Sequence, residues 1–305
     1  MATLLWEPSA ERVAGANLTR FATFAGERCG RTFESYAELY RWSVDDIPAF
    51  WAAAWDFLGI QASAPYTAVI DDLSRFPGAT WFPGARLNMA ENLLRYRDDE
   101  VALIFVGETA APVRMTYAEL YRSVARLAGA LRAAGVVPGD RVAGYLPNVI
   151  ETVVAMLAAS SVGAIWSSCA TDVGPEAAVD RLGQIEPKVL FVVDGYRYKD
   201  RVFDCIPNAA AVTRSIPTIE RVVVAHYAGD ADADLSSIRG ALHWDEFVAG
   251  QTGEDLAFEQ VPFDHPGVVM FSSGTTGKPK CLVQSGGGIL INQLKELVLH
   301  ADVTR

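Results

Sequence analysis

From residue 101 onward, short apolar runs alternate with stretches whose apolar residues recur at helical spacing, and this alternation limits the possible folds more than any other feature. Because the links are short, successive strands are expected to be parallel and joined by helices. Residues 188–193 (KVLFVV) are almost continuously apolar, as strands covered on both faces are. We therefore expect an α/β fold of layered, mostly parallel sheets flanked by helices. Strands are predicted at residues 141–146, 164–168, 188–193, 221–225, 267–272 and 280–284, and helices at residues 116–134, 149–162 and 174–185.

Local signals indicate where several helices begin and end. Thr116 and Glu119 have the spacing of a capping box, and Gly135 suits the left-handed residue that ends a helix. The first hundred residues are rich in aromatic residues and show helical spacing over residues 35–59, with one break at Pro48. Further predictions are a Pro-Gly turn and short helix over residues 81–94, a surface loop over residues 229–234 and an amphipathic helix over residues 288–300.

The formal net charge of −11 argues against a nucleic-acid partner, because such proteins need a concentrated basic face. An acidic chain that binds a phosphate must gather its few cations locally, so the position of each lysine matters more than their number. The four widely spaced cysteines contain no CxxC pair, which predicts neither a disulfide framework nor a zinc site. No leader or membrane-spanning run is visible, so we expect a cytoplasmic protein with no membrane partner.

One segment, residues 271–281 (FSSGTTGKPKC), has a composition that core packing does not explain. Gly274 and Gly277 allow positive φ, so that several backbone N–H groups turn toward one point and form a concave nest for an anion. Lys278 and Lys280 add positive charge. Hydroxyl donors suited to phosphate oxygens come from Ser272, Ser273, Thr275 and Thr276.

The flanking sequence places this loop between two strands that we expect to be buried, because GVVMF precedes it and CLV follows it. A P-loop reading fails, since only two residues separate the glycines and Pro279 stands where that motif requires Ser or Thr. An ordinary surface turn rich in Ser, Thr and Gly is the structural alternative. The lysines and the flanking apolar runs favour a cradle for a triphosphate.

The segment closely resembles the phosphate-binding signature of the adenylate-forming superfamily, which commonly reads [ST]SG[ST]TGxPKG. Cys281 stands in place of the final glycine. The resemblance implies the fold of the N-terminal domain of these enzymes, here truncated, and ATP as a substrate with Mg²⁺ carried by the nucleotide. It further implies that Ser272, Ser273, Gly274, Thr275, Thr276, Gly277, Lys278 and Lys280 bind the ATP phosphates, with Lys278, Thr275 and Thr276 acting in catalysis.

Other stretches resemble one branch of this superfamily. Residues 81–94 (WFPGARLNMAENLL) are similar to the leader of short-chain acyl-CoA synthetases, although a packed Trp-Phe turn would also explain them. Residues 180–198 and 286–303 resemble acetoacetyl-CoA synthetases more than acetyl-CoA synthetases. The resemblance implies a helical N-terminal extension over residues 1–100 and a partial AMP-binding domain over residues 101–305.

The relatives also carry a basic segment that contacts the 3′-phosphate end of coenzyme A (CoA). Arg197, Tyr198 and Lys199, followed by Arg201, hold that position here, after Gly195. A solvated charged loop is the competing interpretation. Gln284 stands where many relatives have histidine, and Cys169 is expected to be a buried small residue instead of a nucleophile. The histidines show no metal spacing, so no metal ligands are predicted.

The reaction that the resemblance implies is acetoacetate–CoA ligation. The carboxylate attacks the α-phosphate of ATP, pyrophosphate leaves, and the CoA thiol then displaces AMP. The acidic YGxTE-type motif, the ribose-binding aspartate and the adenylation lysine of the family do not occur before Arg305, so we expect an incomplete portion that makes no acyl-CoA alone. An acetyl- or propionyl-CoA synthetase, an amino-acid adenylating domain and a non-catalytic nucleotide-binding remnant remain alternatives, and acyl specificity and oligomeric state are not readable.

Overall fold

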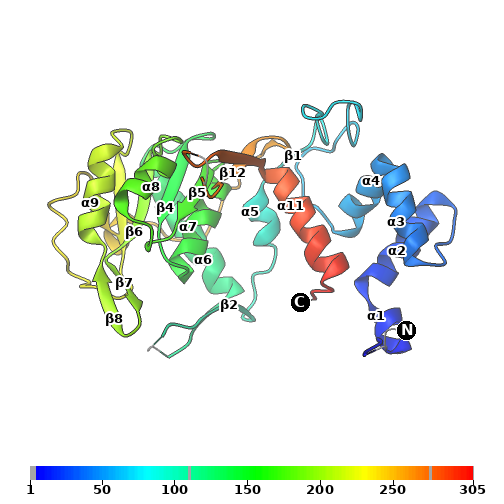
Figure 1. Cartoon of the computed structure of the whole chain (residues 1–305), viewed down its shortest axis with the longest axis horizontal. Helices are drawn as coiled ribbons and strands as arrows, with labels where there is room; N and C mark the ends of the chain where they lie inside the picture. The colour runs from blue at the N-terminus through cyan, green and yellow to red at the C-terminus, as the bar shows by residue number, and fades with distance from the viewer. Residues whose placement is uncertain (1–4, 109–110, 275–276, 305) are drawn as a thin grey trace. The chain divides into compact units, whose positions relative to one another are not determined.

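The computed structural model describes residues 5–108, 111–274 and 277–304. The chain divides into two compact units (Figure 1). The first contains Met1–Arg86, Pro262–Asp264 and Gly287–Arg305, and the second contains Leu87–Val261 and His265–Gly286. The division that the resemblance implies, into a helical extension over residues 1–100 and a partial AMP-binding domain over residues 101–305, stays a prediction.

Aromatic side chains form the centre of the first unit. The ring of Phe21 lies edge-on to those of Phe50 and Phe57, at centroid distances of 5.8 and 5.3 Å. The ammonium group of Lys295 lies 5.8 Å from the ring centroid of Trp51. The helices of this part of the chain are α1 (Ala10–Gly15), α2 (Asn17–Cys29), α3 (Tyr36–Asp45), α4 (Ile47–Phe57), α11 (Gly286–Leu294) and the π-helix η1 (Lys295–His300).

The break predicted at Pro48 is confirmed. Helix α3 ends at Asp45, and α4 begins at Ile47 with Pro48 in its first turn, where the missing proline N–H costs no helical hydrogen bond. Asp46 caps the second helix, because its carboxylate accepts a 3.1 Å hydrogen bond from the N–H of Ala49.

The second unit is built on a seven-stranded sheet in the order β10-β9-β6-β4-β5-β12-β13. All neighbouring strands are parallel except β12 and β13, which are antiparallel. The predicted mostly parallel α/β fold is therefore confirmed. The strands are β4 (Arg141–Tyr145), β5 (Ile165–Cys169), β6 (Val189–Val193), β9 (Arg221–Ala225), β10 (Ala241–His243), β12 (Pro266–Phe271) and β13 (Cys281–Ser285).

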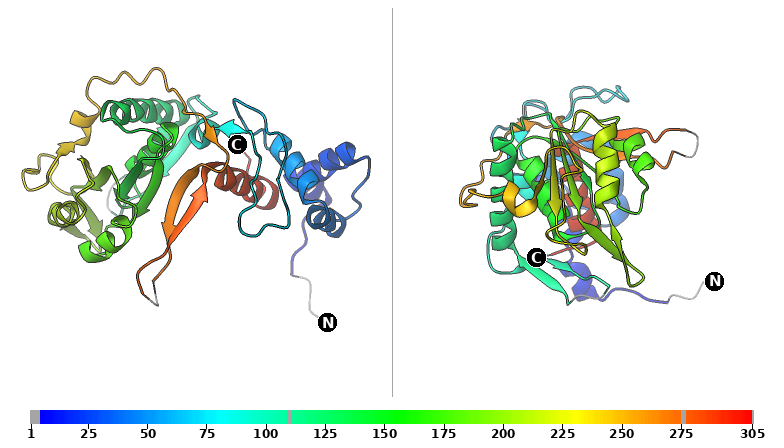
Figure 2. Two further views of the ribbon diagram at one scale, coloured as in Figure 1. Left: turned by 90° about the horizontal axis from the view of Figure 1, so that it is seen from above. Right: turned by 90° about the vertical axis from the view of Figure 1, so that its left-hand side faces the viewer.

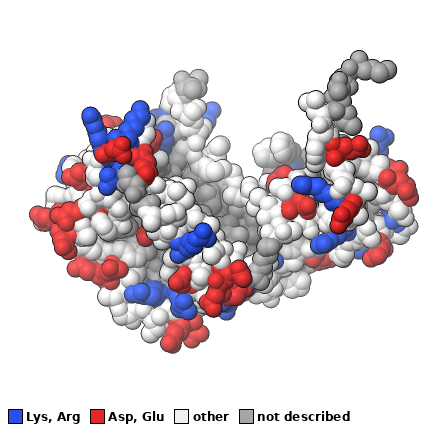
Figure 3. Space-filling view, turned by 90° about the horizontal axis from the view of Figure 1, so that it is seen from below, with Lys and Arg blue, Asp and Glu red and all other residues white. Residues whose placement is uncertain are grey.

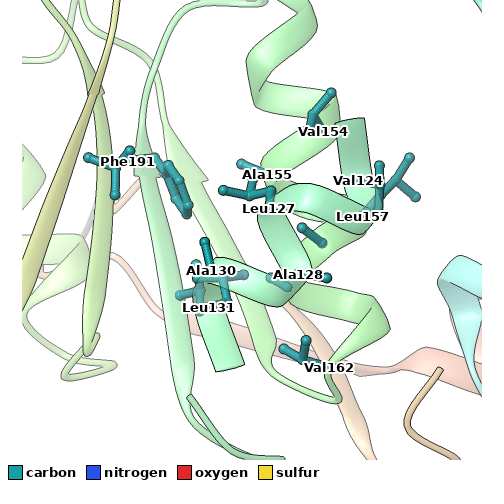
Figure 4. Close-up of a cluster of buried hydrophobic side chains, with 14 of the residues drawn as sticks. Val124, Leu127, Ala128, Ala130, Leu131, Val154, Ala155, Leu157, Val162 and Phe191 are labelled. Atoms are coloured by element: carbon teal, nitrogen blue, oxygen red, sulfur yellow. The ribbon is translucent and has the colours of Figure 1, made fainter. Parts of the chain in front are cut away.

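Helices cover both faces of this sheet (Figure 2). Helices α6 (Tyr117–Ala133) and α7 (Ile150–Ser161) pack on one face with Phe191 of β6 (Figure 4). Helices α8 (Pro175–Leu182) and α9 (Ile206–Ser215) pack on the other face with Leu190 of the same strand. Because every residue of β6 is buried, its continuous apolar run is explained.

Helix α6 begins as its sequence predicts. The Thr116 hydroxyl accepts from the N–H of Glu119, and the Glu119 carboxylate accepts from the N–H of Thr116. Gly135 follows the helix with φ of +79°. The remaining elements are β1 (Arg86–Leu87), α5 (Met89–Leu93), β2 (Val101–Phe105), β3 (Val113–Thr116), β7 (Gly195–Tyr198), β8 (Arg201–Asp204), α10 (Trp244–Phe247) and β11 (Val261–Pro262).

One expectation about burial is wrong. Strands β12 and β13 are present, but β13 lies at the edge of the sheet, where Leu282 and Val283 are 49% and 60% exposed. An edge strand has only one neighbour, so an apolar sequence alone does not establish burial. The hairpins β2–β3 and β7–β8 were not predicted. No helix in the described part of the chain is long and apolar enough to cross a membrane.

Asn88 joins three segments of the second unit. Its amide nitrogen donates to the carbonyl oxygens of Ser160 at 2.9 Å and Glu259 at 2.8 Å. Its amide oxygen accepts from the N–H of Ala90 at 2.9 Å and caps helix α5. The side chain is 1% exposed, so no water replaces these partners if it is removed.

We predict that Asn88→Ala lowers the free energy of unfolding by about 2–4 kcal/mol, because it removes a helix cap and leaves buried carbonyl groups unpaired. Urea unfolding followed by circular dichroism measures the loss. Asn148→Ala, at an exposed position, is the matched control and should change the value by less than about 0.5 kcal/mol. Equal effects of the two substitutions would contradict the stabilising role assigned to the hydrogen bonds of Asn88.

Candidate functional site

The parallel strands of the second unit bring several predicted site segments to one edge of the sheet. Strands β4, β5, β6, β9 and β12 all run in the same direction, so the residues that follow them share an edge. The order β5-β4-β6-β9-β10 places the reversal of strand order between β4 and β6. Ligands of open parallel sheets bind outside the carboxyl ends of the strands at such a reversal.

The predicted phosphate loop leaves this edge after β12, and its base is closed by its own backbone. The N–H of Ser272 donates to the carbonyl oxygen of Lys280 at 3.0 Å, and the N–H of Lys280 donates to the Ser272 hydroxyl at 2.9 Å. Ser272 therefore holds the two ends of the loop together. Its direct contact with phosphate remains a prediction.

Glycine is required at one point inside the loop. Gly274 has φ of +70°, and a Cβ atom there would lie 2.8 Å from the carbonyl oxygen of Gly277. A 3.2 Å hydrogen bond from the N–H of Gly277 to the carbonyl oxygen of Gly274 also joins these two glycines. Among the described residues, none accepts a backbone hydrogen bond from the N–H groups of Ser273, Gly274 and Lys278.

Lys278 extends from the loop with 78% of its side chain exposed, and the nearest carboxylate oxygen, on Asp180, is 3.9 Å from its ammonium group. Such an exposed pair contributes little and leaves the ammonium group available. The loop exit is fixed from the turn that follows α8, since the Gln184 side chain donates to the carbonyl oxygen of buried Pro279 at 2.9 Å. Thr275 and Thr276 lie outside the described residues, and their roles in phosphate binding and catalysis stay predictions.

The two residues that depart from the family pattern both lie on β13. Cys281 pairs with Phe271 and packs against the buried cluster beneath the sheet. Gln284 is half-buried and lies opposite Val268. Cys169 is half-buried, although a buried residue was expected, and desolvation raises the pKa of its thiol to about 12, which disfavours the thiolate near neutral pH.

The predicted CoA segment is a β-hairpin that begins directly after β6. Arg197 and Tyr198 lie on β7, Lys199 lies in the two-residue turn, and Arg201 begins β8. The Lys199 ammonium group lies 5.2 Å from the ring centroid of Tyr198, which is 53% exposed. The structure therefore brings the basic residues together at the carboxyl edge, on an ordered hairpin instead of an irregular loop.

Sequence reasoning missed the carboxylate that anchors this hairpin. Asp194, which is 3% exposed, accepts hydrogen bonds from the N–H groups of Gly195 at 2.7 Å and Tyr227 at 2.9 Å. Its other oxygen binds the imidazole of His226. Strands β6 and β9 are neighbours, so a single aspartate joins the segments that leave them. Only the position of Asp194 directly after an apolar strand indicated a special role.

Burial by itself raises the pKa of Asp194, but the N–H groups of residues 227–229 and the imidazole of His226 outweigh it, so the pKa lies below its ordinary value. Space around this carboxylate is limited. A Cβ atom on Gly229 would lie 2.9 Å from the backbone carbon of Asp194, and one on Gly195 would lie 2.8 Å from the carbonyl oxygen of Phe203. Both glycines permit the close approach.

Within the described residues, no group of three or more His, Cys, Asp or Glu side chains has the arrangement of a metal site. Glu151 lies in the first turn of helix α7 on the same edge, and burial raises its pKa, although a backbone hydrogen bond and His226 oppose the shift. Besides these groups, the segments that leave this edge carry backbone N–H groups, hydroxyls and cations, which are suited to binding anions.

We predict that Asp194→Asn lowers the free energy of unfolding at pH 7 by about 2 kcal/mol, because a charged acceptor of several hydrogen bonds is lost. The folded-state pKa is depressed, so the carboxylate stabilises the fold above the unfolded pKa of about 3.9, and this contribution disappears as the pH falls further. Urea titrations from pH 7 to pH 3 should show the difference between wild type and variant shrinking below about pH 4.

Asp232→Asn is the control for removal of one carboxylate, since Asp232 is exposed in the loop after β9. It should change stability little across the same pH range. A difference for Asp194→Asn that stays constant down to pH 3 would show that the ionised carboxylate does not contribute as described.

Both parts of the chain match known protein families. The model of the AMP-binding enzyme family matches residues 89–303, and that of the acetyl-coenzyme A synthetase N-terminus matches residues 36–93. The acetoacetyl-CoA synthetase of Danio rerio is 43% identical over 99% of this chain, and that of Rhizobium meliloti (strain 1021) is 44% identical over 98%. A malonamoyl-CoA synthetase of Penicillium aethiopicum is 36% identical over 98% of the chain.

Among solved structures, an acetoacetyl-CoA synthetase from Streptomyces lividans superposes with a TM-score of 0.93 at 47% identity. The match covers 99% of this chain and 46% of that one. The chain likewise spans 46% of the length of the Danio rerio and Rhizobium meliloti proteins and 43% of the Penicillium aethiopicum protein. It therefore spans about half the length of the relatives that it matches.

Proposed function

Because the chain belongs to the family of AMP-binding enzymes, we propose that it is part of an acetoacetate–CoA ligase that works through an acyl-adenylate. The observation that carries the proposal is the loop that leaves the carboxyl edge of a parallel sheet after β12, because the N–H groups of Ser273 and Gly274 donate to no described residue and Lys278 is exposed. Similarity to acetoacetyl-CoA synthetases over 98–99% of the chain supports the choice of acid.

In the proposed reaction, the carboxylate of acetoacetate attacks the α-phosphate of ATP, and pyrophosphate leaves with the bonding electrons. The protein then needs to position the nucleotide and neutralise charge, with little covalent chemistry of its own. Lys278 and the N–H groups of Ser273 and Gly274 would hold the β- and γ-phosphates as negative charge develops on them. Thr275, Thr276, Gly277 and Lys280 complete the proposed set.

Mg²⁺ would accompany the nucleotide phosphates and reduce their mutual repulsion. The described residues offer no cluster of carboxylate, cysteine and histidine side chains to hold the ion on their own, so the phosphates themselves would carry it. CoA is the second proposed substrate, and Arg197, Tyr198 and Lys199 on the β7–β8 hairpin would contact its nucleotide end. We also propose a cytoplasmic location with no nucleic-acid partner, in keeping with the net charge of −11.

The names of two relatives point to a chemical group that acetoacetate shares with malonamate. Acetoacetate and malonamate both carry a carbonyl group at the third carbon, with a methyl group in one and an amide nitrogen in the other. A relative named for each acid matches nearly the whole chain. We therefore propose short 3-oxo carboxylates and their close isosteres as the substrate class, with acetyl- or propionyl-CoA synthesis as the alternative.

We predict that Lys278→Ala weakens ATP binding by about 10- to 100-fold, as expected for one hydrogen bond between charged groups. AMP lacks the β- and γ-phosphates, so its affinity should change by less than about twofold, and ATP should then bind no more tightly than AMP. Calorimetric titration of the 305-residue chain measures both. Heat of ATP binding is expected without formation of acyl-CoA.

Arg214→Ala is the control for loss of one exposed cation, since Arg214 lies in the last turn of α9, near the amino end of β9 and so at the opposite edge. It should leave the affinity for ATP within about twofold of wild type. Equal losses for ATP and AMP in Lys278→Ala, or no binding of ATP by the wild-type chain, would refute the proposed loop function.

A further inference from the structure

The tip of the β7–β8 hairpin gathers three cationic side chains beside the carboxylates of Asp200 and Glu108. Arg197, Lys199 and Arg201 lie within five successive positions, and none of them forms an ion pair with a residue that the structure describes. Figure 3 shows a face on which Lys and Arg side chains gather beside a few carboxylates. Three unpaired cations on one hairpin create a local field that attracts an anion.

The backbone of the hairpin turn already holds an anion. The N–H of Lys199 donates to one carboxylate oxygen of Glu108 at 3.2 Å, and the N–H of Asp200 donates to the other at 3.3 Å. Lys199 and Asp200 have φ of +49° and +59°, as the central residues of a two-residue hairpin turn do. Their consecutive N–H groups therefore converge on one small anionic group.

We propose that this turn is an anion site that Glu108 occupies while no ligand is bound, and that a phosphate monoester at the nucleotide end of CoA replaces the Glu108 carboxylate. This inference rests on the proposed use of CoA, and it adds that the Glu108 carboxylate competes with the CoA phosphate for the turn. A phosphate group reproduces both N–H contacts and carries more charge toward the three cations than a carboxylate does.

Exposure makes the exchange possible. Glu108 is an exposed side chain that comes from the segment after β2, and it reaches the turn through these two hydrogen bonds. Releasing it into water costs little, unlike the release of a buried carboxylate. While Glu108 is bound, the site is unavailable, so the apparent affinity for the phosphate is reduced by the fraction of time that the site is free.

The experiment compares CoA with 3′-dephospho-CoA, which lacks only the monoester. Glu108→Ala should strengthen the binding of CoA to the 305-residue chain by about fivefold and leave that of 3′-dephospho-CoA within about twofold. Glu254→Ala is the matched control. It removes one exposed glutamate carboxylate of the same unit and leaves Glu108 and the turn unchanged. It should leave both affinities within about twofold of wild type.

Two results would overturn the inference. One is an equal gain for both ligands in Glu108→Ala, and the other is a gain for CoA in Glu254→Ala that matches the gain in Glu108→Ala, since either result means that bulk charge decides the affinity. ATP titration of the same variants separates this failure from that of the proposed function. Unchanged ATP binding with no preference for CoA over 3′-dephospho-CoA would refute the proposed anion site but not the proposed function of the phosphate loop.

A second measurement does not depend on CoA. Amide resonances of Lys199 and Asp200 should shift in Glu108→Ala, and the same two resonances of the wild-type chain should shift when adenosine 3′,5′-bisphosphate is added. Resonances that respond to neither change would refute the occupancy of the turn by Glu108.

Discussion

The parallel pairing of β4 with β6 determines where chemistry can take place in this chain. Strand β6 is buried along its whole length, with Phe191 and Leu190 packed in clusters on opposite faces of the sheet, so a slip by one residue would disrupt both clusters. The fixed register sets the carboxyl ends of the strands at one edge. The phosphate loop and the basic hairpin leave that edge from different strands, although they are separated by about seventy residues of sequence.

Charge makes this edge selective. A chain with a net charge of −11 repels anions from most of its surface, so a phosphate ligand needs local cations and directed N–H groups. Lys278 on the loop and Lys199 on the hairpin are both exposed. Neither region relies on charge alone, because each also presents backbone N–H groups whose direction is set by residues with positive φ.

Local patterns were enough to predict what local physics decides. The apolar run of β6, the Thr116–Glu119 capping box and the break at Pro48 all depend on residues close in sequence, and all were predicted. The bonds of Asp194 to His226 and of Glu108 to Lys199 join residues 32 and 91 positions apart, which no periodicity records. Burial of β13 was overestimated for the same reason, since strand order is also a long-range property.

The two carboxylates that hold the hairpin differ in how deeply they are buried. Asp194 lies at its base, is 3% exposed and is surrounded by N–H groups and an imidazole, so removing its charge leaves several donors without a partner. Glu108 lies at its tip, is exposed and accepts two hydrogen bonds longer than 3 Å, which water or another anion can replace. The same functional group is therefore structural at one end of the hairpin and exchangeable at the other. A rigid base keeps the turn N–H groups directed at one point when the occupant changes, and this is the property that an anion site requires.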